Sequence, residues 1–136
     1  MINNRGESTM QNLSRIGAGV IGALALLASV NWIVNPAGAA ASLGMPLLEG
    51  AGRSTQLGDL TAFFTGIGVL CLVGAWQRAP AQLFSAALFL GLTAVFRTLA
   101  WAVHGADFAS AAIVAEVVLS GLLVLCARSI SGVTQA

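Results

Sequence analysis

The most informative residues of this chain are ionisable side chains that lie within long apolar stretches. Arg97 lies in the third stretch, Glu116 lies in the fourth, and Asp59 begins the second. A charged side chain at the centre of a bilayer costs about 2.5–3.5 kcal/mol on the insertion scale, so it is expected to pair or to serve a function. One guanidinium can donate to two carboxylates at once. We therefore expect Arg97 to bridge Glu116 and Asp59.

Helical periodicity indicates the direction in which this cluster points. Residues of the third stretch recur at i, i+4, i+8 and i+11 on one helix face, namely Thr93, Arg97, Trp101 and His104. Glu116 lies in a stripe of mostly small residues, which is expected to pack against other helices. Asn31 lies near the end of the first stretch and Asn35 directly follows it. Both are expected to be further partners of Arg97. The predicted ligand-binding residues are Asn31, Asp59, Arg97, Trp101 and Glu116.

Several kinds of chemistry are open to such a cluster. It could be a purely structural ion pair that fixes the helix register, or a polar pocket open to one side of the membrane. In a membrane enzyme acting on a lipophilic small molecule, such as an isomerase or hydrolase, Glu116 or Asp59 would be the general acid or base. Arg97 would then be the electrostatic stabiliser. In a proton-coupled carrier, a buried carboxylate that titrates against Arg97 would be the switch.

We favour a non-enzymatic accessory or small-ligand-binding protein, and the remaining motifs add no other chemistry. The chain has no nucleophile elbow, P-loop, HExxH or CxxC motif, so we expect neither a metal nor a cofactor. Cys71 and Cys126 lie in apolar stretches and are expected to be inert packing residues. His104 is interpreted as an interfacial residue. The formal net charge of +1 argues against nucleic-acid binding.

The elements that position these residues follow from the composition. Hydrophobic residues make up 57% of the chain and charged residues only 8%, whereas a soluble domain has about 25% charged residues. Lipid is therefore the expected solvent. About 20 helical residues cross the hydrocarbon core, and four apolar stretches are long enough, at about 16–34, 57–76, 81–103 and 108–127. The predicted fold is all-α, an antiparallel four-helix transmembrane bundle over residues 16–127.

The segments outside these helices give the expected topology. The segment 1–15 is polar, and the long connection 35–56 contains an apolar part, 37–48, that is expected to form a short interfacial helix. The other two links are short, which makes the last three helices sequential antiparallel neighbours. Arg residues gather at one end of the helices, at Arg5, Arg15, Arg78 and Arg128. The positive-inside rule then predicts cytoplasmic termini, including the tail 128–136, and a periplasmic loop 35–56.

The order of short motifs resembles the bacterial small four-helix membrane proteins grouped as domain of unknown function 4345. The motifs are Asn35-Pro36, Leu43-Gly44-Met45-Pro46, Arg53, Gln56-Leu57-Gly58-Asp59-Leu60, Phe64, Gly66, Phe96-Arg97, His104-Gly105-Ala106-Asp107 and Ala115-Glu116, within 16–127. The resemblance implies a multi-pass protein of the bacterial inner membrane with an acid–Arg–Glu arrangement, and it implies no activity. The expected partners are the lipid bilayer and a small lipophilic ligand. A homo-oligomer or a larger membrane complex is left open.

Overall fold

The computed structural model describes residues 4–132, with side chains from residue 6 onward, and the described chain is all-α. Its helices in chain order are α1 (Asn4–Val34), α2 (Pro36–Ser42), α3 (Gly50–Gln77), α4 (Pro80–His104) and α5 (Ser110–Ser131). The four long helices are each long and apolar enough to cross a membrane. The chain is therefore a multi-pass membrane protein, and the predicted all-α four-helix fold is confirmed.

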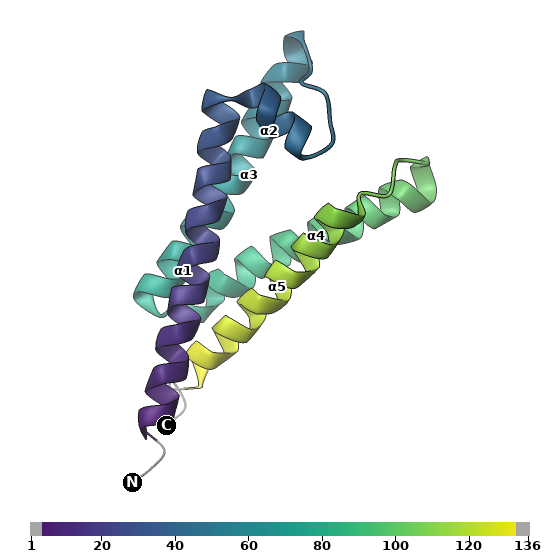
Figure 1. Ribbon diagram of the computed structural model, residues 1–136. Helices are drawn as coiled ribbons and strands as arrows, with labels where there is room; N and C mark the ends of the chain where they lie inside the picture. Colours follow the sequence, from purple (N-terminus) through teal and green to yellow (C-terminus); the bar gives the residue numbers. More distant parts are fainter. Residues whose placement is uncertain (1–3, 133–136) are drawn as a thin grey trace.

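The four long helices are arranged as two antiparallel pairs that diverge from a common base (Figure 1). In one pair α1 packs along α3, and in the other α4 packs along α5. The contact between α3 and α4 is much smaller than either of these. Arg78 has left-handed backbone angles (φ 53°, ψ 43°) and ends α3, and Pro80 begins α4 after this turn. The turn sends α4 away from α3, so the prediction that these two consecutive helices are antiparallel neighbours is wrong along most of their length.

Two glycines allow α1 and α3 to approach closely. A Cβ atom at Gly22 would lie 2.9 Å from the Cβ of Cys71 and 3.0 Å from the carbonyl oxygen of Gly68. A Cβ atom at Gly68 would lie 2.6 Å from Cγ of Leu26. Small residues are the usual means of close packing between membrane helices, because lipid provides little hydrophobic force to bring them together. This contact fixes which helix α3 pairs with.

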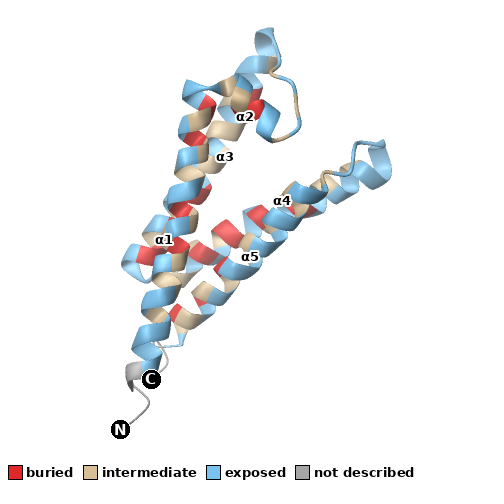
Figure 2. Ribbon diagram, viewed as in Figure 1, coloured by how far each residue is buried: buried red, intermediate tan, exposed pale blue. Residues whose placement is uncertain are grey.

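Buried residues gather where the two pairs meet and beside α2 (Figure 2). Leu83, Leu123 and Cys71 are fully buried at the meeting point. The second buried group lies under α2, where Trp32 is only 2% exposed and packs with Ala39, Ala40 and the part-buried Phe64. Most other large apolar side chains are exposed along the helices, as expected for surfaces that face lipid.

Helix boundaries differ from the expected ones mainly where the ends are polar. The helix expected from residue 16 begins at Asn4, and the helix expected from residue 57 begins at Gly50. Most of the expected loop 35–56 is therefore helical, including α2, which overlaps the segment 37–48 for which we predicted an interfacial helix. The physical reason is that hydropathy reports the part of a helix that lies in hydrocarbon, and the polar turns of these helices continue beyond it.

Candidate functional site

Arg97 and Glu116 form an ion pair between α4 and α5. The Nε–H of Arg97 donates to Oε1 of Glu116 at 2.9 Å. The side chains are 26% and 12% exposed, respectively. A charge-assisted bond in such surroundings is stronger than a neutral one. This part of the predicted cluster is present in the structure.

The α4–α5 pair positions these two residues through the small-residue face of α5. Ser120 lies one turn beyond Glu116, and its hydroxyl donates to the backbone carbonyl of Ala87 at 2.8 Å. A Cβ atom at Gly91 would lie 3.3 Å from this hydroxyl, so the two helices are close here. Leu123, one turn further, is fully buried. Glu116 therefore faces α4, in agreement with the direction that periodicity predicted.

Neither member of the pair uses all of its hydrogen-bonding capacity within the described chain. Oε2 of Glu116 is buried and has no hydrogen-bond partner among the described residues. Arg97 donates through Nε alone, although a guanidinium carries five N–H groups. Buried polar atoms are nearly always satisfied in folded proteins, so an exception calls for an explanation. Arg97 is thus able to donate to a further molecule, whereas the unpartnered oxygen of Glu116 is buried.

A groove along α4 has Arg97 near one of its ends. It has a volume of about 540 Å³ and is lined by Phe89, Leu92, Thr93, Phe96, Arg97 and Ala100. Apart from Arg97, the only polar lining side chain is Thr93, whose hydroxyl already donates to the carbonyl of Phe89 at 2.8 Å. Arg97 is therefore the only charged group along an apolar surface.

The structure does not bring the predicted residues of α1 and α3 to this pair. Asp59 lies on α3, in the other helix pair, where its side chain is exposed and forms no ion pair with any described side chain. The prediction that Arg97 bridges two carboxylates is therefore wrong for Asp59. Asn31 is part-buried on α1. Asn35 instead caps α2, with its Oδ1 accepting from the N–H of Gly38 at 3.2 Å. These residues lie away from Arg97 because the two helix pairs diverge.

Trp101 lies one turn beyond Arg97 and is half-exposed. Its ring packs edge-on against Phe108, with centroids 5.1 Å apart and an interplanar angle of 60°. This contact closes the link between α4 and α5. His104 is exposed in the last turn of α4. Trp101 thus remains near Arg97 on the sequence-predicted face, and its contact partner is Phe108.

Two polar residues that sequence reasoning overlooked organise the other helix pair. Gln56 is 8% exposed; its Oε1 accepts from the N–H of Leu48 at 2.9 Å and its amide donates to the carbonyl of Pro46 at 3.1 Å. Ser29 lies 2.7 Å from the hydroxyl of Thr65, which links α1 to α3. The available signal was a polar residue beside or within an apolar stretch, which does not by itself indicate a partner.

An apolar cavity lies where the two helix pairs meet. It has a volume of about 170 Å³, and residues of all four long helices line it, including Ile21, Phe64, Leu90 and Leu119. Phe64 also packs against the Trp32 group, so the cavity adjoins the buried group under α2. No polar side chain lines this cavity. It could hold only an apolar group.

Comparisons of the chain with protein-family models, with curated proteins and with solved structures gave no match. The resemblance to domain of unknown function 4345 therefore stays a prediction. The assignment of function rests on the chemistry of the Arg97–Glu116 pair.

Proposed function

We propose that this protein binds a neutral lipophilic molecule, with a carbonyl or hydroxyl head at the Arg97–Glu116 pair and an apolar body along the α4 groove. The observation that carries the proposal is the unused hydrogen-bonding capacity of Arg97 at one end of an apolar groove of about 540 Å³. Ligand sites are typically apolar with a few placed polar groups, and their volumes are about 300–1,000 Å³. The groove shares the apolar lining and the placed polar group of such sites, and it is open to the surrounding lipid.

The charge of the pair favours a neutral head over an ionised one. Glu116 balances Arg97, and Asp59 is exposed on the other helix pair. An anionic ligand would add an uncompensated charge beside Glu116, which is costly in lipid surroundings. A carbonyl or hydroxyl oxygen could accept from the free N–H groups of Arg97.

The environment that we propose is a bacterial inner membrane with both termini in the cytoplasm. Arg15 and Arg78 lie at the same end of the α1–α3 pair, because Arg15 contacts the last turn of α3. Arg128 lies beside the first turns of α1. The positive-inside rule then supports a cytoplasmic position for this end. The Arg97 groove would lie toward the periplasmic side.

Co-purification tests the binding proposal. The protein is purified in a mild detergent, and bound molecules are extracted and compared by mass spectrometry. Ala100→Phe fills the groove and leaves the ion pair in place, so a neutral lipophilic species enriched with the parent should be depleted at least several-fold. The matched control is Ala115→Phe on an exposed face of α5, which should retain it. Equal recovery from Ala100→Phe and the parent would contradict the proposal.

A membrane enzyme is the second candidate, favoured by the unpartnered Oε2 of Glu116. A buried carboxylate oxygen beside a guanidinium is suited to act as a general base toward a C–H or O–H group, with Arg97 stabilising the developing oxyanion. Glu116→Gln keeps the shape of the side chain and removes its ability to exchange a proton. A stable Glu116→Gln protein that fully complements a deletion strain would exclude acid–base chemistry at this residue.

A further inference from the structure

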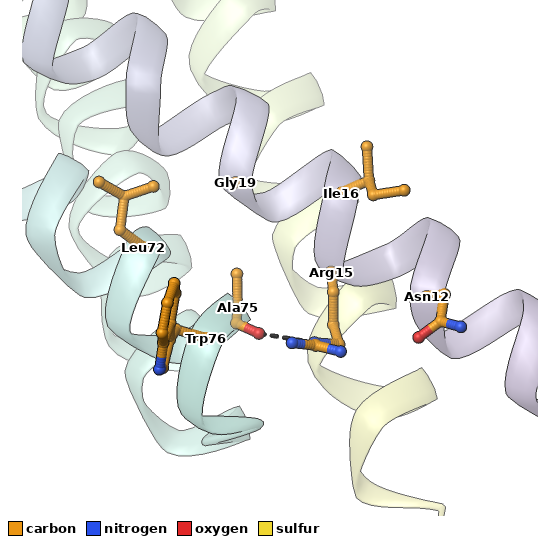
Figure 3. A pocket seen from close by; sticks show the side chains of 7 residues that line it. All are labelled: Asn12, Arg15, Ile16, Gly19, Leu72, Ala75 and Trp76. Carbon is orange, nitrogen blue, oxygen red and sulfur yellow. Dashed lines mark hydrogen bonds between the residues drawn. The ribbon is translucent and has the colours of Figure 1, made fainter.

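Arg15 of α1 contacts the C-terminal end of α3 (Figure 3). Its Nε–H donates to the backbone carbonyl of Ala75 at 2.7 Å. This carbonyl belongs to the last turn of α3, where backbone carbonyls have no N–H partner within the helix. The bond uses one of the five N–H groups of the guanidinium. Most of the charged group therefore remains available to an acceptor outside the protein.

Arg15 lines an open pocket of about 530 Å³ between α1 and α3. Figure 3 shows the guanidinium between the indole of Trp76 and the amide of Asn12, with the side chains of Ile16 and Leu72 pointing the other way. Trp76 is 84% exposed. Polar groups thus lie at one level and apolar side chains at the next, which is the order of groups in a lipid at a membrane surface.

The apolar part of the pocket is open along α1. A Cβ atom added at Gly19 would meet no other atom within 4 Å. Gly19 lines the pocket together with Ile16 and Leu72, one turn deeper than Arg15. A hydrocarbon chain could therefore lie over Gly19 without any rearrangement of the helices.

We propose that this pocket binds an anionic phospholipid of the phosphatidylglycerol class, with its phosphate at Arg15 and an acyl chain over Gly19. Guanidinium groups match phosphate oxygens in geometry and charge. None of the seven residues that line the pocket is acidic. Arg78 is exposed at the C-terminal end of α3. These two cations outweigh the negative end of the α3 dipole, which is about half a charge.

Native mass spectrometry of the full-length chain in detergent measures this binding. The protein is titrated with dioleoyl phosphatidylglycerol and, separately, with dioleoyl phosphatidylcholine. We expect at least about a tenfold preference for phosphatidylglycerol, equivalent to about 1.4 kcal/mol. Equal binding of the two lipids would overturn the assignment of an anionic ligand. Displacement of the lipid by millimolar inorganic phosphate would also overturn it, because the site would then recognise phosphate alone.

Two variants separate the head from the chain. Arg15→Gln should weaken phosphatidylglycerol binding about tenfold, whereas Arg53→Gln, at the other end of α3, should not change it. Gly19→Leu fills the apolar part and keeps the Arg15–Ala75 bond, so it gives a result even where Arg15→Gln fails to fold. Gly121→Leu is its control, because a side chain there also meets nothing within 4 Å. Parent-like binding by either Arg15→Gln or Gly19→Leu would show that the proposal is wrong.

Discussion

Replacement of Arg97 by alanine should destabilise the fold through the carboxylate that it leaves behind. Glu116 is only 12% exposed, and its Oε2 has no partner in the described chain. Without Arg97, neither carboxylate oxygen of Glu116 would have a hydrogen-bond partner in the described chain. Breaking a buried ion pair from one side costs about 3–5 kcal/mol. Because Arg97 retains 26% exposure, we expect the lower end of that range, about 3 kcal/mol.

Thermal unfolding in detergent, followed by circular dichroism, measures this loss. For a domain of this size, about 3 kcal/mol corresponds to a decrease of about 10 °C in Tm. Arg53→Ala is the matched control, since Arg53 is exposed and donates to the carbonyl of Leu48 at 2.9 Å. It should change Tm by no more than about 3 °C.

A double variant distinguishes the unpaired charge from lost packing. Replacing both Arg97 and Glu116 by methionine removes both charges, and such apolar replacements of buried pairs are often neutral. The double variant should therefore melt close to the parent and above Arg97→Ala. Arg97→Lys should lose less than half as much stability as Arg97→Ala, because Arg97 contacts a single carboxylate through one N–H. Parent-like stability of Arg97→Ala would refute the reasoning. A double variant that is no more stable than Arg97→Ala would also refute it.

Three further predictions concern topology and packing. A reporter fused at the C-terminus or in the α3–α4 turn should be active in the cytoplasm, and one between α2 and α3 should be active in the periplasm; any reversal contradicts the assignment. Gly22→Ala should lower Tm, because its Cβ would meet Cys71 at 2.9 Å, whereas Gly66→Ala, where nothing lies within 4 Å, should leave Tm equal or higher. Gln56→Ala should cost about 1–3 kcal/mol by leaving the Leu48 N–H unpaired, and faster proteolysis of the α2–α3 loop would report it.

The sequence was sufficient to predict the Arg97–Glu116 pair because both residues lie at similar distances from one short link. The link connects α4 to α5 as antiparallel neighbours. Residues equally far from such a link must lie at the same depth, and periodicity then decides whether they face each other. Both conditions could be read from the chain. The same reasoning gave the four apolar helices, because hydropathy reports burial in lipid directly.

The position of Asp59 could not be predicted in the same way. Hydropathy places Asp59 at the start of its stretch and periodicity gives its helix face, but neither indicates which helix that face meets. The choice is made by the close contact of Gly22 with Gly68, which pairs α3 with α1. The glycines are visible in the sequence as small residues. The sequence does not show which helix they contact, because small residues also occur at positions such as Gly66, where an added Cβ would meet no atom within 4 Å.

The separation of Asp59 from Arg97 changes the chemistry that the site supports. With two carboxylates and one guanidinium, the cluster would carry a surplus negative charge, which suits a proton-dependent switch. With Glu116 alone, the pair is balanced, and a change of protonation would leave Arg97 as an uncompensated charge beside lipid, at a cost of about 2.5–3.5 kcal/mol. Carbonyl or hydroxyl recognition requires no such change. The balanced pair at the end of an apolar groove therefore favours binding of a neutral molecule over proton-coupled transport.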